Sequence, residues 1–488
     1  MNMASQITQY EWATVDQKNA DIKWETIIWG SVIRKVNKLQ SRIAKAITKR
    51  MKNLARKLQY LLSKSYYTKL LAIRQVTTNK GKKTAGVDKV LWSTATSKYI
   101  NALKLTNKNY KAKALKRVHI SKSNGKKRPL GIPTMHDRAM QALYAKTLDP
   151  ISETTADKVS FGFRKYRSCD DAKEYLFKLL GKKISAQWIL EGDIKGCFDN
   201  INHEWLKENI LIDRKILNQF LKAGFVHNKK LFPMEKGTPQ GGIISPILAN
   251  MTLDGLEELL KRKYWTNSRG TINRKYNRVN KINLVRYADD FVVTATNKEV
   301  LEEAKELIEE FLKERGLELS KEKTKITHIN TGFNFLGWNF RKYNGKLIIK
   351  PSKESYKSII NEIRKKIKKN RTAKQENLIR ILNQKIRGWC NYHRSACSKK
   401  SYQSLDRDIF HALWSWAKRR HPNKTKQWIK NRYWIRNETR DWIFSDRNIK
   451  LIFASDTKII RHRLIKFAAN PYLKEYDKYY LRRKLRLK

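Results

Sequence analysis

Two adjacent carboxylates, Asp289 and Asp290, stand between two short apolar runs in the segment INLVRYADDFVV at 282–293. Runs of β-branched residues on both sides of a short polar break predict a strand, a tight turn and a second strand. The turn would hold two negative charges close together, and such a pair is costly unless a hard cation neutralises it. Taken alone, the same pattern also suits a solvent-exposed Asp-Asp turn without any chemistry.

A third carboxylate, Asp193, ends the apolar run WILEGD at 188–193, which predicts a buried strand. Three carboxylates from two strands can hold two divalent ions roughly 4 Å apart, as in-line displacement at phosphorus requires. Mg²⁺ suits such a site because it prefers a few carboxylates together with substrate phosphates. We therefore expect two Mg²⁺ ions here, one at a primer 3′-hydroxyl and the other at the triphosphate of an incoming nucleotide.

The charge of the chain points to a polyanionic partner. Its 488 residues include 106 Lys and Arg against 44 Asp and Glu, which gives a formal net charge of +62. A surface this positive repels itself unless a polyanion is nearby. Aromatic residues make up 10% of the chain, including 14 Trp, and cations interleaved with aromatics suit phosphate neutralisation and base stacking. The composition therefore favours a nucleic-acid-binding protein.

The cysteines argue against a zinc ribbon and a disulfide framework, because no two of them form a C-x-x-C pair. They are scattered as Cys169, Cys197, Cys390 and Cys397. The N-terminal stretch is interrupted by acidic residues and predicts no signal peptide. No apolar run approaches the length of a membrane span, so we expect no membrane partner.

Several elements must position these residues. Residues 31–72 have apolar residues near helical spacing among many cations, which predicts a basic amphipathic helix. Residues 114–134 predict a β-hairpin around the Asn124-Gly125 turn. A helical stretch to about residue 180, a Gly-rich loop at 236–242, an acidic helix at 301–315 and short strands at 325–329 and 346–350 follow. From residue 351 the chain is predicted to be helical and very basic, and residues 421–488 to be irregular.

Seven motifs in order along the chain resemble those of the proteins encoded by mobile group II introns, which are reverse transcriptases and maturases. They are TAGVD (84–88), KRPLGIP (127–133), SFGFR (160–164), TPQGGIISP (238–246), YADD (287–290), FLGW (335–338) and IRGWCNYH (386–393). One such motif would be weak evidence, but seven in sequence are specific. The resemblance covers the chain from about residue 31 onward.

The resemblance implies an α+β fold of the right-hand polymerase type, with an antiparallel sheet in the fingers and palm. It divides the chain into an N-terminal extension of basic helices (1–82), fingers and palm (83–345), a helical thumb or maturase domain (351–420) and a basic DNA-binding segment (421–488). In this scheme Asp193, Asp289 and Asp290 are the catalytic, metal-binding triad.

The resemblance also implies contacts to the incoming nucleotide and the primer. Lys122 and Arg128, on either side of the hairpin turn, match residues that clamp the triphosphate. Phe198 matches the aromatic residue that blocks a ribose 2′-hydroxyl, and Gln240 the residue near the nascent base pair. The turn expected to grip the primer end contains Leu336, Gly337 and Trp338.

Further nucleic-acid contacts are expected outside the polymerase site. The residues expected to bind RNA, from the N-terminal helix and the thumb, are Arg34, Lys38, Arg42, Lys45, Arg387 and Arg394. Those expected to bind DNA lie among tryptophans in the C-terminal segment and are Lys424, Lys430, Arg432 and Arg436.

These features predict an RNA-directed DNA polymerase that uses dNTPs and binds its group II intron RNA and target DNA. It would assist splicing and reverse splicing into DNA and copy the inserted RNA. Two alternatives are an RNA-binding maturase with a vestigial polymerase and a stand-alone, defence-type reverse transcriptase. The intact triad argues against the first, and the GWCNYH segment at 388–393 with the basic tail argues against the second.

Members of this family often end in a metal-bound HNH-type endonuclease with paired cysteines. The chain has no such pairs, so we expect no cleavage of the second DNA strand and priming from an existing 3′-end. The expected location is the bacterial cytoplasm, or the matrix or stroma if the gene is organellar. The sequence leaves the oligomeric state open.

Overall fold

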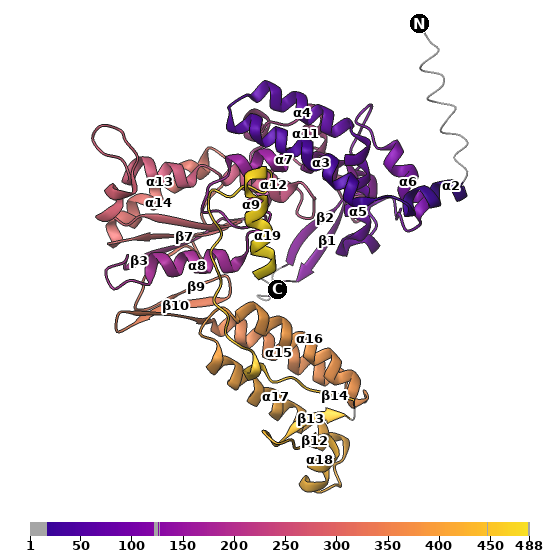
Figure 1. The fold of residues 1–488 in the computed structure, drawn as a ribbon, viewed down its shortest axis with the longest axis vertical. Helices are drawn as coiled ribbons and strands as arrows, with labels where there is room; N and C mark the ends of the chain where they lie inside the picture. The colour runs from indigo at the N-terminus through magenta and orange to yellow at the C-terminus, as the bar shows by residue number, and fades with distance from the viewer. Residues whose placement is uncertain (1–16, 122–124, 126, 447, 487–488) are drawn as a thin grey trace.

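The computed structural model describes residues 17–121, 125, 127–446 and 448–486 (Figure 1). Helices surround several small sheets whose strands are mostly antiparallel, so the predicted α+β class is confirmed. Within this described part of the chain, no helix combines the length and the apolar character needed to cross a membrane.

Helices dominate the first part of the chain. They are α2 (Gln17–Glu25), α3 (Trp29–Thr48), α4 (Lys52–Lys64), α5 (Tyr66–Thr78), the 3₁₀ turn η1 (Lys80–Lys83), α6 (Ala95–Lys104) and α7 (Met135–Thr155). The prediction of one helix over 31–72 is wrong, because three helices share this stretch. The chain turns at Arg50, where φ is 57°, and at Ser65, which is extended. Neither glycine nor proline marks these turns, so the apolar spacing runs across them unbroken.

A four-stranded sheet of the fingers follows in the order β2-β1-β4-β5. Strands β1 (Leu115–Ser121) and β2 (Lys127–Ile132) form the predicted antiparallel hairpin, and β4 (Phe225–His227) pairs with β1 in parallel and with β5 (Lys230–Phe232). The hairpin turn itself, with Lys122, lies outside the described residues except for Gly125.

The palm is built on a second four-stranded sheet in the order β6-β7-β3-β8. Its strands are β3 (Trp188–Asp193), β6 (Asn283–Tyr287), β7 (Asp290–Ala295) and β8 (Lys325–His328). Alternate side chains enter two cores, with Leu190 and Val293 on one face and Ile189 and Val292 on the other. A sheet buried on both faces holds the strand ends in place.

Several helices lie before and between these strands along the chain. They are α8 (Cys169–Leu180), α9 (Cys197–Asn200), α10 (His203–Asn209), α11 (Arg214–Leu221), α12 (Ser245–Leu253), α13 (Leu256–Tyr264), η2 (Arg274–Arg278) and α14 (Lys298–Lys313). The predicted helical stretch to about residue 180 is in fact α7 and α8, with a non-helical segment between them at 156–168. This segment contains the SFGFR motif.

The palm leads into a small sheet and then the thumb. Strands β9 (Phe333–Phe335), β10 (Trp338–Tyr343) and β11 (Lys346–Pro351) pair in the order β11-β10-β9. Helices α15 (Lys353–Lys369), α16 (Gln375–His393) and α17 (Lys399–Arg420) share a core of their own, which includes Ile360, Leu382 and Leu413. Figure 1 shows these orange helices projecting below the palm.

The prediction that residues 421–488 are irregular is wrong for much of this segment. Helix α18 (Lys426–Tyr433) and strands β12 (Trp434–Ile435), β13 (Ile443–Asp446) and β14 (Ile449–Lys450) extend the thumb core. Trp434 is buried there beside Phe444, so its ring is not available for stacking on bases. The chain then passes η3 (Ala454–Asp456), η4 (Lys474–Tyr476) and α19 (Asp477–Arg486).

Residues 460–486, which we call the C-terminal strap, run from the thumb back to the palm (Figure 1, yellow). Their anchor is Asp171, which is fully buried at the start of α8. One oxygen, Asp171 Oδ1, lies 2.9 Å from His462 Nε2 and accepts hydrogen bonds from the Ile465 backbone N–H (2.9 Å) and the Arg483 guanidinium (2.7 Å). The other, Oδ2, completes a capping box with Ser168. The Asp171 carboxylate thus caps α8 and also hydrogen-bonds the strap to it.

Candidate active site

Two of the three predicted acidic residues are direct neighbours across the palm sheet. Strand β3 runs antiparallel to β7 in a register that places Asp193 opposite Asp290. Residues opposite each other in such a ladder project from the same face. Asp289 belongs to the two-residue turn that joins β6 to β7. The fold therefore gathers all three carboxylates at one end of the palm sheet.

The turn that carries Asp289 has an unusual backbone and close support. Ala288 has a φ of 57°, a left-handed conformation that costs energy for a residue with a side chain. The SFGFR loop supports it, since Phe161 N–H donates to Arg286 C=O at 2.9 Å. A Cβ atom on Gly162 would lie 2.3 Å from the Ala288 nitrogen, so only glycine permits this approach. The motif at 160–164 thus holds the YADD turn.

The electrostatics of the three carboxylates favour a cation. Burial raises the pKa of Asp289, and burial together with the charges of Asp289 and Asp193 raises the pKa of Asp290 to about 6. Partly desolvated carboxylates at neighbouring strand ends suit a hard divalent ion such as Mg²⁺. The residues therefore fit the expected metal.

Lys323 is a residue that sequence reasoning missed. Its ammonium group donates to both oxygens of Asp193, at 3.0 and 2.9 Å. Asp193 is thus paired with Lys323, and no three His, Cys, Asp or Glu side chains form a ready metal-ligand group among the described residues. The backbone explains the position of Lys323, since Ser320 N–H donates to Asp193 C=O at 2.8 Å. Nothing in the lysine-rich run at 321–325 marks it out.

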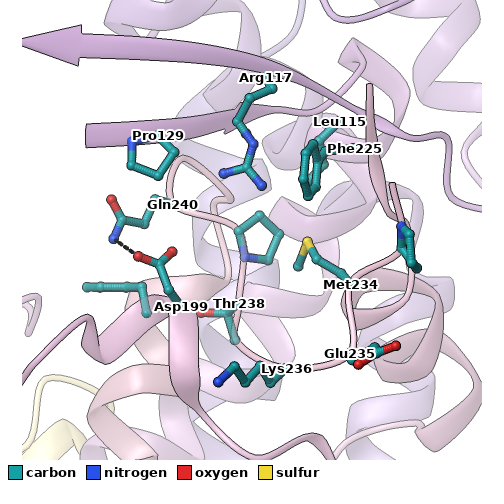
Figure 2. A pocket seen from close by; sticks show the side chains of 14 residues that line it. Leu115, Arg117, Pro129, Asp199, Phe225, Met234, Glu235, Lys236, Thr238 and Gln240 are labelled. Carbon is teal, nitrogen blue, oxygen red and sulfur yellow. Dashed lines mark hydrogen bonds between the residues drawn. The ribbon is translucent and has the colours of Figure 1, made fainter. Parts of the chain in front are cut away.

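A cavity of about 500 Å³ lies between the fingers sheet and the palm (Figure 2). Phe198 and Gln240, both predicted to contact the nucleotide, line it together with Pro129 of β2. Gln240 Nε2 donates to Asp199 Oδ2 at 3.3 Å, and the Gly131 N–H donates to the Gln240 backbone carbonyl at 2.9 Å. The loop at 236–242 is thereby fixed to both the palm and the fingers.

Two further cavity residues were not predicted from the sequence. Arg117 projects from β1 into the cavity in Figure 2, with its guanidinium 3.7 Å from the centre of the Phe225 ring. The alternation of β1 could have identified it, since Arg117 shares a face with Leu115. Asp199 follows Phe198 directly and could have been found by its position.

Arg128, a predicted nucleotide contact, is exposed on β2, and its charge opposes the effect of burial on the pKa of Asp289.

The predicted primer-grip turn divides into half-buried and fully buried parts. Leu336 and Gly337 form a two-residue turn with φ values of 49° and 80°, between β9 and β10. Trp338 is fully buried and stacks on Tyr392 of α16 at 4.7 Å between ring centres. Tyr392 also donates to the Leu336 carbonyl at 2.8 Å. Any contact with a primer would therefore come from Leu336 and Gly337, while Trp338 joins the turn to the thumb.

The cations predicted to bind nucleic acid lie on different surfaces. The four on α3 are all exposed and succeed one another along one side of the helix: Arg34, Lys38, Arg42 and Lys45. On the thumb, Arg387 is exposed on α16 and Arg394 follows its end, half-buried.

Near α18 the predicted DNA contacts are partly engaged within the protein. Lys424 and Arg432 are exposed. Lys430 lies 4.6 Å from the Trp442 ring centre, and Arg436 pairs with Asp441 at 3.1 Å. Exposed pairs of this kind are weak, so they leave these cations able to exchange partners.

Comparison with known families gives three matches along the chain. Reverse transcriptase (RNA-dependent DNA polymerase) matches residues 120–340, the N-terminal domain of reverse transcriptase matches 24–105, and the group II intron maturase-specific domain matches 356–434. Reverse transcriptases are nucleotidyltransferases that generally depend on Mg²⁺, and the maturase-specific domain indicates an RNA partner.

Curated relatives agree with these matches. The chain is 32% identical over 426 residues to the group II intron-encoded protein LtrA of Lactococcus lactis, which covers 69% of each chain. It is also 32% identical over 300 residues to protein YkfC of Escherichia coli, covering 54% of this chain and 78% of that protein. A putative COX1/OXI3 intron 1 protein of Saccharomyces cerevisiae is 27% identical over 318 residues, covering 55% and 38%. The chain therefore belongs to the group II intron-encoded proteins and is an RNA-directed DNA polymerase with a maturase domain.

Proposed function

We propose that Asp193, Asp289 and Asp290 hold two Mg²⁺ ions and that the adjoining cavity receives a dNTP. The observation that carries this proposal is the cross-strand pair Asp193–Asp290 beside the Asp289 turn. When bound, the ions would activate the primer 3′-hydroxyl and neutralise the leaving pyrophosphate. Lys323 would release Asp193 as the carboxylate turns to the metal.

The other cavity residues would orient the nucleotide. Phe198 would lie under the sugar, and Gln240, held by Asp199, would face the nascent base pair. Arg128 on β2 would contact the triphosphate, because guanidinium groups form charge-assisted bonds to phosphate oxygens. Lys122 is proposed for the same role from sequence alone.

Changing Phe198 to alanine should raise the use of ribonucleotides. Its ring is half-buried and packs edge-on against Phe163 at 6.4 Å between centres. The ring is therefore held in place, and the 2′-hydroxyl of a ribonucleotide would clash with it. We expect the rNTP to dNTP ratio of kcat/KM to rise at least about tenfold, since a steric clash of this size is worth one or two kcal/mol. Phe232→Ala in β5 is the control. An unchanged ratio would show that Phe198 only packs.

We further propose that the protein binds its intron RNA, assists splicing and reverse splicing into DNA, and copies the inserted RNA. Support comes from the maturase-specific match at 356–434, from the exposed cations of α3 and α16, and from the net charge of +62. Target DNA would contact the exposed end of the thumb near α18. Primer extension on an RNA template, run beside an intron splicing assay, tests this function, and failure of both would reject it.

Replacing the four α3 cations together with alanine should weaken intron RNA binding more than polymerisation. Arg34, Lys38, Arg42 and Lys45 form no ion pair with a carboxylate among the described residues, so their charges are available to phosphates. Each lost phosphate contact should lower the slope of log affinity against log salt by about one. Titrations at several salt concentrations measure the slope. Equal loss of extension on an unstructured template would instead place α3 in the polymerase channel.

A further inference from the structure

A second cavity, which we call the thumb-base pocket, lies where β10 and β11 meet the first turns of α15 and α17. Its volume is about 750 Å³, within the range of sites for small organic ligands. It shares no lining residue with the nucleotide cavity. Neither the catalytic triad nor the FLGW turn contributes to it.

The rim of the thumb-base pocket is strongly positive. Five lysines line it and no Asp or Glu does: Lys350, Lys353, Lys357, Lys399 and Lys400. In the described part of the chain, none of the five forms an ion pair. Two of them have other partners: Lys399 donates to the Ser455 carbonyl, and Lys350 Nζ lies 5.8 Å from the centre of the Tyr343 ring. Uncompensated lysines around one cavity repel one another, and an anion inside would relieve that repulsion.

Two helix starts add to the positive potential. The first turns of both α15 and α17 line the cavity. The hydroxyl of Ser398 donates to the His393 carbonyl at 2.8 Å and so does not cap α17. At α15 the Ser352 hydroxyl already accepts from the Ser355 N–H at 3.1 Å. Phosphate oxygens are well matched to the uncapped N–H groups of α17 together with the lysines.

One wall of the thumb-base pocket is apolar and open. Tyr343 and Ile348 are each 36% exposed and Ile459 is 50% exposed. They come from β10, β11 and the segment that leads to the C-terminal strap. The Tyr343 ring also has cationic neighbours, with the Arg341 guanidinium 4.8 Å and Lys350 Nζ 5.8 Å from its centre. An aromatic ring set among aliphatic side chains and cations can stack on a base while the cations take its phosphates.

We propose that the thumb-base pocket binds an unpaired nucleotide of a structured RNA. The base would lie against Tyr343, Ile348 and Ile459, and the phosphates would meet the lysines. This inference rests on the RNA binding proposed above and adds a site that distinguishes unpaired from paired RNA. A perfect duplex keeps its bases stacked inside and cannot use the apolar wall. An acidic peptide would satisfy the lysines but would leave the stacking wall unused.

Cys397 allows a direct test, because it lines the pocket and is exposed. The full-length protein is treated with a thiol alkylating reagent, and modification of the Cys397 peptide is followed by mass spectrometry. We expect a single-stranded oligoadenylate to slow this modification at least about fivefold, through a bound base and phosphates. A duplex RNA of equal length and poly-glutamate at equal charge should slow it much less. Equal rates with and without oligoadenylate, or equal protection by all three, would overturn the proposal.

Variants separate the two parts of the site. With Tyr343→Ala, about ten times more oligoadenylate should be needed for the same protection of Cys397. Lys353→Glu combined with Lys400→Glu should abolish the protection. The matched control reverses two exposed lysines of α15 outside the pocket, Lys365→Glu with Lys368→Glu, and should retain protection. Loss of protection in the control as well would mean that bulk charge, and no pocket, is responsible.

Primer extension by the same preparations separates this inference from the proposed function. The pocket variants should extend a primer on a short RNA template at the wild-type rate. Protection of Cys397 in a protein that cannot extend a primer would support the pocket and reject the polymerase assignment. Normal extension without protection of Cys397 would support the polymerase assignment and reject the pocket.

Discussion

Asp289→Asn should reduce RNA-templated DNA synthesis by at least about 10³-fold, because it removes a negative charge from the group that would hold the metal. The two side chains have almost the same shape, so the YADD turn should keep its backbone. Asp289 lies in that turn beside Asp290, whose carboxylate already has a raised pKa. Single-turnover primer extension with saturating Mg²⁺ measures the loss.

RNA binding should survive this change, since the exposed cations of α3 and the thumb are untouched. Glu306→Gln, an exposed position on α14 without an ion pair, makes the same chemical change outside the site and should keep full activity. Near-normal extension by Asp289→Asn would remove Asp289 from the catalytic group. Loss of intron binding along with extension would indicate a folding defect instead.

Asp171→Ala should destabilise the protein by about 3–5 kcal/mol, the cost of removing one partner from a buried charged cluster. The change leaves the guanidinium of Arg483 and the ring of His462 without their carboxylate and removes the capping box of α8. Urea unfolding measures the free energy, and hydrogen exchange of the C-terminal strap reports its release. Asp477→Ala, exposed at the start of α19, should change stability by a few tenths of a kcal/mol.

The contribution of Asp171 should also depend on pH. Burial alone would raise the pKa of this carboxyl, but hydrogen bonds and charges from His462 and Arg483 hold it below the ordinary 3.8. A carboxyl with a lowered pKa in the folded state stabilises fully above its unfolded value and loses that contribution as the pH falls through the folded value. The stability gap between wild type and Asp171→Ala should thus be constant near neutrality and shrink below about pH 4. A gap that widens in acid would contradict this.

Local patterns were sufficient to predict that the three candidate carboxylates come together. Asp193, Asp289 and Asp290 each adjoin a strand whose composition is unmistakable, and antiparallel pairing then brings them together. The hairpin at 114–134 was found for the same reason, since Asn124-Gly125 marks its turn. Features that depend on distant contacts were missed. Lys323 reaches Asp193 through a loop without any signal, and the helix breaks at Arg50 and Ser65 contain neither glycine nor proline.

The C-terminal strap could not be predicted because its partners are far away in sequence. Residues 460–486 carry little apolar periodicity, and their order comes from Asp171, Asp149 and Arg167 on the palm side. Trp434 near α18 was misread for a similar reason, whereas Trp428 and Trp442 are exposed as expected of a binding surface. Trp434 packs with Trp414 and Phe444 inside the thumb, and composition alone does not distinguish such a core from a stacking surface.

The strap also makes the folding of the palm depend on residues that are synthesised much later. Contacts such as Arg167 with Phe467 and Asp149 with Tyr472 join residues that are 300 and 323 positions apart. During translation the palm emerges first and must wait, with the Asp171 carboxylate lacking its partners, until residue 483 leaves the ribosome. Closure over so long a loop is slow and late. A nascent chain that has not yet reached residue 483 therefore holds a palm in which the buried Asp171 carboxylate still lacks its guanidinium partner.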